Sequence, residues 1–359
     1  MRCLVVGGTG FLGGAIAAAL AEAGHDTTVL SRRRDPQGLP AGMRAIRGDR
    51  DADLSALSGA AFDWVFDTCA YAPDMVERLL DALPAPPARY VLVSSISTYG
   101  TFATPRREDE AVAAATDADL ALAAAVPAGE RASAFAYGAS YGPLKRACEI
   151  AALDRLGDRA TILRVGLLVG VGDYTNRLTW WVRRLDRAAV EGGPVPAPTA
   201  GVAQMIDVRD VANFALRLAA EGRNGTWNVT GPATPLADVL HAVADTVGHR
   251  HGFHWLAPDA ITAAGVEPWT DMPLMSPPDP DFRCFMDVDT TKAMAGGLAL
   301  RPLERTLEAL LSWDRARRNV PLSCGLSPEQ ERQLLAIDPA PGTKKGGPAM
   351  DPPRITREP

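Results

Sequence analysis

Short runs of β-branched and aliphatic residues alternate with Ala-rich stretches of helical periodicity along the first half of the chain. Two of these stretches, 12–23 and 74–83, predict helices. Strands that alternate with helices at this spacing form βαβ units, whose crossovers are nearly always right-handed. The pattern therefore predicts an α/β fold with a doubly wound parallel sheet, the Rossmann fold. The runs that predict its strands are 4–6, 27–30, 64–66, 90–93, 161–164 and 225–229.

Two regions interrupt this alternation. Residues 101–140 form an insertion rich in Ala, Asp and Glu, within which 111–125 has a helical pattern. From Gly231 onward, Pro and Gly become frequent and the alternation fades. We expect a Rossmann domain at 1–170, to which 206–230 returns, and a smaller C-terminal lobe at 171–205 and 231–337. The last segment, 338–359, has almost no apolar residues and predicts a disordered tail.

Composition narrows the class of protein. The 359 residues are 47% hydrophobic and 22% charged, which excludes wholesale disorder. No apolar run approaches the roughly 18 residues of a membrane span, and the first strand runs into glycines rather than an export signal. A net charge of −6 offers nucleic acid no basic field. Five scattered cysteines without CxxC spacing suit a reducing cytoplasm. We expect a cytoplasmic protein without nucleic-acid or membrane partners.

A glycine-rich loop follows the first strand directly. Gly7, Gly10 and Gly13 have the spacing G-x-x-G-x-x-G and lead into the first predicted helix. Glycine there permits a tight turn and a close approach to a pyrophosphate, which the helix N-terminus then binds through free N–H groups. In this strand–turn–helix context the loop indicates a dinucleotide site.

The end of the second strand indicates which nucleotide is bound. NAD-dependent proteins of this type usually carry an acidic residue there, for the ribose 2′-OH. This chain has Ser31 followed by Arg32, Arg33 and a third arginine, and a guanidinium suits a 2′-phosphate. A solvated basic turn is the alternative. We predict NADP, with NAD as the second choice, and expect Asp49, at the end of the third strand, to accept from the adenine amino group.

The candidate chemistry lies in two segments. Tyr141 and Lys145 are four residues apart and share one helix face, with Pro143 confined to the first turn. An ammonium beside a phenol favours the phenolate, whose unperturbed pKa of about 10 is too high for neutral pH. A serine from the Ser-rich end of the fourth strand region then polarises the substrate oxygen while the tyrosine transfers a proton.

The glycine loop, Ser95 in Val-Ser-Ser-x-x-x-Tyr-Gly and Tyr141-x-x-x-Lys145 resemble the extended short-chain dehydrogenase/reductase family, the NAD(P)-dependent epimerase/dehydratase group. Further segments at 163–173, 206–212 and 227–231 extend the resemblance over roughly residues 1–320. It implies that Ser95, Tyr141 and Lys145 form a catalytic triad. The implied cofactor site comprises Gly7, Thr9, Gly10, Phe11, Leu12, Gly13, Ser31, Arg32, Arg33, Asp49, Arg50, Cys69, Ala70, Tyr71, Tyr141, Lys145 and Val165.

Departures from the family pattern are informative. Sugar 4,6-dehydratases of the family carry Thr-Asp-Glu where this chain has Ser95-Ile96-Ser97, so we expect no elimination of water. Asp67 stands where many relatives have His, close to the cofactor cleft. The long interval between Ser95 and Tyr141 suggests that the insertion caps the active site.

The smaller lobe offers weaker candidates for substrate binding. Besides Ser97, these are Asp173, Arg177 and Trp180, which follow the fifth strand where the family's substrate loop begins. Arg177 suits an anionic group and Trp180 a ring, with a packed lobe helix as an equally weighted alternative. His249, His251 and His254 lack a Cys or acidic partner at ligand spacing, which favours a surface turn and strand over a metal site.

The resulting hypothesis is an NADP-dependent oxidoreductase acting on a carbonyl or alcohol of a small or medium-sized metabolite. An NAD-dependent epimerase of a nucleotide sugar or related compound is the first alternative. A non-catalytic nucleotide- or RNA-binding relative is the second, which the complete triad and the acidic charge disfavour. A homodimer is left open.

Overall fold

The computed structural model describes residues 1–32, 42–110 and 112–341, and the chain divides into two compact units. The first unit comprises 1–168, 206–231 and 288–300, and the second takes 169–205, 232–287 and the chain from 301 onward. We had placed 288–300 in the smaller lobe. Its helix α9 (Thr291–Ala295) instead packs on β10 (Gly225–Val229), and Ala293 and Leu298 are buried in the core of the first unit.

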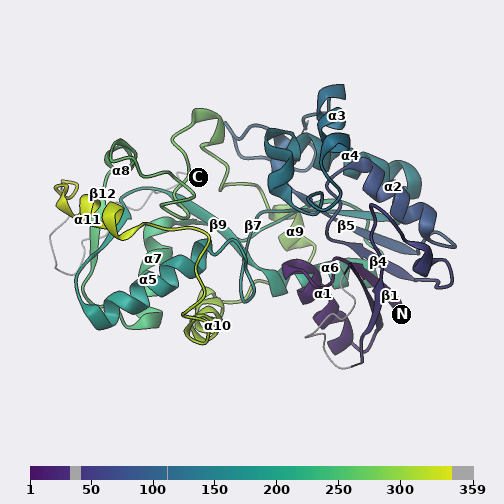
Figure 1. Ribbon diagram of the computed structural model, residues 1–359, viewed down its shortest axis with the longest axis horizontal. Helices are drawn as coiled ribbons and strands as arrows, with labels where there is room; N and C mark the ends of the chain where they lie inside the picture. Colours follow the sequence, from purple (N-terminus) through teal and green to yellow (C-terminus); the bar gives the residue numbers. More distant parts are fainter. Residues whose placement is uncertain (33–41, 111, 342–359) are drawn as a thin grey trace. The chain divides into compact units, whose positions relative to one another are not determined.

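The first unit is built on a sheet of seven parallel strands, which confirms the doubly wound fold (Figure 1). Their order across the sheet is β10-β6-β5-β4-β1-β2-β3. The carboxyl ends of parallel strands meet at one edge, where such sheets bind their ligands. The other strands are β1 (Arg2–Val6), β2 (Asp26–Ser31), β3 (Arg44–Arg47), β4 (Trp64–Asp67), β5 (Arg89–Ser95) and β6 (Ala160–Val165).

Helices cover both faces of this sheet (Figure 1). On one face α1 (Phe11–Glu22) and α6 (Val208–Ala220) pack on Val5 and Phe66, and on the other α2 (Pro73–Ala82) and α4 (Tyr141–Leu156) pack on Leu4 and Val65. Consecutive strand residues thus enter opposite cores, which is why these strands read as continuous apolar runs instead of alternating ones.

The insertion contains a shorter helix than expected. Instead of 111–125, helix α3 spans Asp117–Ala125, because Thr116 and Asp119 form a capping box that starts the helix there. The 3₁₀ segment η3 (Ala134–Ser140) then leads into α4. At the other end of the chain, most of the predicted disordered tail lies outside the described residues, although Ala340 donates a backbone hydrogen bond to Trp255 at 2.9 Å.

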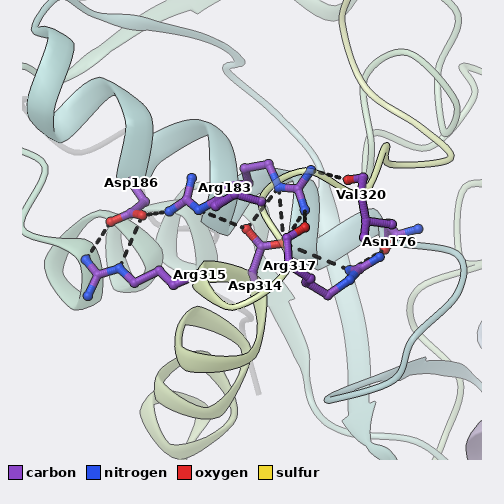
Figure 2. A network of polar contacts seen from close by, with 8 residues as sticks. Asn176, Arg183, Asp186, Asp314, Arg315, Arg317 and Val320 are labelled. Atoms are coloured by element: carbon purple, nitrogen blue, oxygen red, sulfur yellow. Dashed lines mark hydrogen bonds and ion pairs between the residues drawn. The ribbon is translucent and has the colours of Figure 1, made fainter.

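The second unit packs three helices together, α5 (Arg177–Glu191), α7 (Leu236–Val247) and α10 (Leu303–Arg315). Figure 2 shows the ion pairs that join α5 to α10, in which Arg183 binds Asp314 at 2.6 Å and Arg315 binds Asp186 at 2.7 Å. The remaining elements are β8 (Val195–Pro198), paired with β12 (Phe253–Leu256), β9 (Val202–Asp207), paired with β11 (Ala233–Pro235), α8 (Pro258–Ala263) and α11 (Pro328–Ala336). Strand β7 (Leu167–Val169) lies where the chain passes from the first unit to the second.

The structure also bears on the histidines, on metal ligands and on membrane spans. His249 Nε2 lies 3.0 Å from the carbonyl oxygen of Gly252, and His254 Nε2 lies 2.9 Å from that of Ile337. In the part of the chain that the structure describes, no three His, Cys, Asp or Glu side chains are grouped as metal ligands. None of the helices described has the length and hydrophobicity of a membrane span.

Candidate active site

The glycine loop is a close-packed turn between β1 and α1. A Cβ added to Gly13 would lie 2.2 Å from the carbonyl oxygen of Gly7, and one on Gly7 would lie 2.7 Å from Thr68 Oγ1. Gly7 also has a φ of +79°, which favours glycine. The N-cap residue of α1 is Gly10, which has no side chain to cap the helix, so the first N–H groups of α1 can bind an anion. This cradle fits the pyrophosphate of a dinucleotide.

The end of β2 adjoins this loop, because Gly7 N donates a hydrogen bond to Leu30 O at 3.3 Å. Ser31 is buried there, and Arg32 is exposed. The neighbouring Arg33, which the sequence also assigned to the cofactor, lies outside the described residues. Among the loop residues, Thr9 is exposed and Leu12 packs in the core. Leu12 can therefore serve a ligand only through its backbone.

Arg50 follows β3 and is held by the buried carboxylate of Asp67, the last residue of β4. Its Nη2 donates to Asp67 Oδ2 at 2.7 Å, and Tyr90 donates to the same oxygen at 2.7 Å. Although burial alone disfavours the charged guanidinium, the charge of Asp67 raises the pKa of Arg50. Arg50 is 8% exposed, and its Nε and Nη1 have no hydrogen-bond partner among the described residues. Asp67 thus orients a cation that keeps two donors unused.

Tyr141 lies close to Ser95 because the first turn of α4 packs directly against the turn after β5. A Cβ on Gly142 would lie 2.2 Å from the carbonyl oxygen of Ser97, in the 3₁₀ turn η2 (Ile96–Tyr99). Burial raises the pKa of Tyr141, and the nearby hydroxyl of Ser95 opposes that rise. Ser95 Oγ also accepts from the Ser97 backbone N–H at 3.1 Å, which fixes the hydroxyl. Helix α4 begins at Tyr141, as Pro143 predicted.

Lys145 lies one turn further along α4 and is almost completely buried. Its Nζ donates to the carbonyl oxygens of Ala70 at 2.7 Å and Val93 at 2.5 Å, and it lies 5.4 Å from the centre of the Tyr71 ring. Burial lowers the pKa of Lys145. Two of the three ammonium protons are therefore bound to these two carbonyl oxygens, near the ends of β4 and β5. Their positions fix the direction of the third N–H bond. Val165, paired with Ser95 across β5 and β6, completes the same edge.

A second buried network supports this edge and escaped the sequence analysis. Glu149, one turn beyond Lys145, accepts from Arg164 at 2.8 and 2.9 Å and from Ser94 at 2.6 Å. It thereby ties α4 to β5 and β6. The available signal was Arg164 itself, a charged residue within an otherwise apolar strand, since buried charges require partners.

The comparisons with known proteins decide the family. The model of the NAD dependent epimerase/dehydratase family matches residues 3–230. The chain belongs to this family.

Relatives of this chain differ in what they do. A 3-diazoavenalumate denitrifying reductase from Streptomyces sp is 30% identical over 266 residues, 69% of this chain and 82% of that protein. The chloroplast stem-loop binding protein of 41 kDa b from Arabidopsis thaliana is 26% identical over 251 residues, 64% of this chain and 58% of that protein. The structure of MoeE5 in complex with UDP-glucose and NAD matches with a TM-score of 0.56 and 21% identity, covering 89% of this chain and 100% of that one. At this identity the structural likeness concerns the fold.

The candidate substrate residues outside the first unit lie in the second unit. Asp173 is buried and accepts from Thr175 N at 2.8 Å, and burial raises its pKa. Arg177 begins α5 with its guanidinium 4.7 Å from the Trp269 ring, and burial lowers its pKa. Trp180 is 7% exposed. The Nε1 edge of its ring lies against the backbone of Gly325, so little of the ring is open to a substrate.

Proposed function

We propose that this chain is an NADP-dependent reductase or dehydrogenase that interconverts a carbonyl and an alcohol on a small or medium-sized metabolite. The observation that carries the proposal is that the first turn of α4 packs against the turn after β5, which brings Tyr141 close to Ser95, with Lys145 buried one helical turn away. All three side chains lie at the carboxyl edge of the sheet that also carries the glycine cradle.

Each residue has a distinct part in the chemistry. The nicotinamide, when bound, supplies or accepts the hydride. In the direction of reduction, the Tyr141 hydroxyl donates its proton to the substrate oxygen and regains one from solvent. Ser95 donates a hydrogen bond to that oxygen as negative charge develops on it. The third proton of Lys145 would donate a hydrogen bond to the cofactor ribose. The positive charge of Lys145 favours the phenolate that remains on Tyr141 after the proton transfer.

The choice of NADP rests on the end of β2. Ser31 and Arg32 occupy the place where an acidic residue would accept the 2′-OH of NAD. An exposed guanidinium attracts a 2′-phosphate, whereas a carboxylate would repel it. The same feature speaks against the epimerase alternative, because enzymes of that type usually retain NAD.

The RNA-binding alternative has the likeness to the chloroplast stem-loop binding protein in its favour. Against it stand the net charge of −6 and the complete set of Ser95, Tyr141 and Lys145, for which a binding protein has no use.

The proposal is tested by screening carbonyl compounds with purified protein and NADPH, following the absorbance of the reduced cofactor. We expect consumption with at least one compound, and consumption about 10²–10⁴-fold slower with the Tyr141→Phe variant. Protein that binds NADPH but returns equal rates for wild type and the Tyr141→Phe variant would remove the proposed acid.

A further inference from the structure

Arg131 ties the insertion to two segments of the first unit, the loop after β3 and the first turn of α2. Arg131, 7% exposed, binds Asp51 through Nη1 at 2.7 Å and Asp74 through Nη2 at 2.7 Å. Asp51 follows β3, and Asp74 lies in the first turn of α2, directly after β4. A doubly wound sheet binds dinucleotides at this carboxyl edge, so the segment around Arg131 lies over strand ends available to the adenosine half.

A second anchor fixes the segment on its other side. The Tyr137 hydroxyl donates to the carbonyl oxygen of Arg131 at 2.9 Å, and the Tyr137 ring stacks on Tyr71 with centroids 5.8 Å apart. Between the two anchors, Phe135 remains 76% exposed. The backbone of this segment is thus held at both ends while it presents an aromatic ring to solvent.

This ring lines an open pocket of about 420 Å³. Arg32 contributes to the wall of the pocket from the end of β2. The rest is supplied by Gly129, Glu130, Ala132, Ser133, Phe135 and Ala136. The volume falls within the range of about 300–1,000 Å³ usual for small-molecule sites. The pocket combines a cation for a phosphate, a carboxylate that accepts from amino or hydroxyl groups, and an aromatic face for a flat ring.

We propose that residues 129–136 form the outer wall of the adenosine pocket, in which Phe135 stacks on the adenine of the cofactor. The proposal rests on the proposed nucleotide-dependent function and deepens it by giving the insertion a role. Arg32 then faces the ribose phosphate, and the Arg131 anchor keeps the wall in place. Stacking does not discriminate between NADP and NAD, so Phe135 governs affinity for both, whereas Arg32 governs the choice between them.

Calorimetric titration of the full chain with ADP-ribose and with 2′-phospho-ADP-ribose tests this wall without any turnover. We expect Phe135→Ala to weaken both ligands about tenfold, within the effect of removing a stacked aromatic residue. Phe135→Trp should retain the affinity. The matched control is Leu120→Ala, a change at an exposed apolar residue of α3 in the same insertion that does not line the pocket; it should bind both ligands as wild type does.

The outcomes separate the wall from the function. Wild-type affinity for both ligands in Phe135→Ala would overturn the wall and leave the proposed function standing. A tenfold loss in Phe135→Ala together with equal wild-type affinities for the two ligands would support the wall and remove the preference for NADP. Wild-type protein that binds neither ligand would overturn both.

Discussion

Two arginines, one in each unit, are held by a buried aspartate, yet their surroundings differ. Arg183 in the second unit uses all three nitrogens, binding Asp314 through Nε and Nη2 and the carbonyl oxygen of Val320 through Nη1 (Figure 2). Arg50 in the first unit binds Asp67 through Nη2 alone, while its Nε and Nη1 find no partner among the described residues. A cation whose nitrogens are all hydrogen-bonded stabilises packing, whereas we propose that Arg50, a buried cation with unused donors beyond the end of β3, binds a ligand.

An unused donor alone does not make a buried arginine a binding site. Arg164 also has a buried nitrogen without a partner among the described residues, yet its guanidinium lies 4.9 Å from the Tyr99 ring and is held by Glu149. We therefore assign it to positioning α4 behind the site. We infer that a buried arginine indicates a binding site where most of its nitrogens are unused, as at Arg50, and serves packing where a carboxylate and a ring already hold it, as at Arg164.

The largest effect is expected where the chemistry is proposed. Tyr141→Phe should lower turnover by about 10²–10⁴-fold, the usual worth of a positioned general acid, and leave NADPH affinity unchanged because the ring still packs. Lys145→Ala should damage both properties, because its ammonium serves cofactor and phenolate. Steady-state kinetics and calorimetry on the two variants measure this, and near-native turnover in both would show the triad to be unused.

A stability effect should follow from breaking the ion pair of Arg183 and Asp314. Asp314→Asn leaves Arg183 without its anionic partner, and loss of one member of a buried ion pair costs about 3–5 kcal/mol. We expect the lower end of that range, because Arg183 is 17% exposed, and no change in NADPH affinity. Urea unfolding with Arg305→Gln as the exposed control measures the difference. A loss no larger than that of the control would place Arg183 among ordinary surface charges.

A smaller effect is expected at Arg50. Arg50→Lys keeps the charge beside Asp67 but loses the planar fork with its two unused donors. NADPH affinity should fall about threefold to tenfold, roughly the worth of one ordinary hydrogen bond, because the lysine keeps the charge. Arg47→Lys, at an exposed position on β3, is the matched control. Unchanged NADPH affinity in Arg50→Lys would mean that Arg50, like Arg183, serves packing and does not bind the cofactor.

The smallest effect concerns the C-terminus. Truncation after Ile337 removes the backbone hydrogen bond from Ala340 to Trp255, which is worth about 1 kcal/mol, and a segment poor in apolar residues. Thermal unfolding should shift by a few degrees at most, and cofactor affinity should stay the same. A much larger drop in melting temperature would mean that the tail contributes substantially to the second unit.

The sequence predicted the sheet because strands buried on both faces are continuous apolar runs, and it predicted the glycine loop because close backbone packing requires glycine at Gly7 and Gly13. It did not predict the partners of Asp67 or Glu149, because Arg50 and Arg164 reach them only through tertiary packing. Nor did it place α9 in the first unit, since five helical residues bury too little to leave a pattern. Trp180 was ambiguous for a different reason, because an aromatic residue in a helix has the same sequence pattern whether it packs in the core or binds a ligand.

Titration of NADPH and NADH into the wild-type protein at matched salt measures whether the nucleotide site prefers NADP. The exposed Arg32 predicts that NADPH binds at least about tenfold more tightly, a difference of roughly 1.4 kcal/mol. In Arg32→Ala the two affinities should converge, whereas Arg44→Ala, on the neighbouring strand β3, should keep the preference. Equal affinities in the wild type, or tighter binding of NADH, would contradict the account and favour an enzyme that retains NAD.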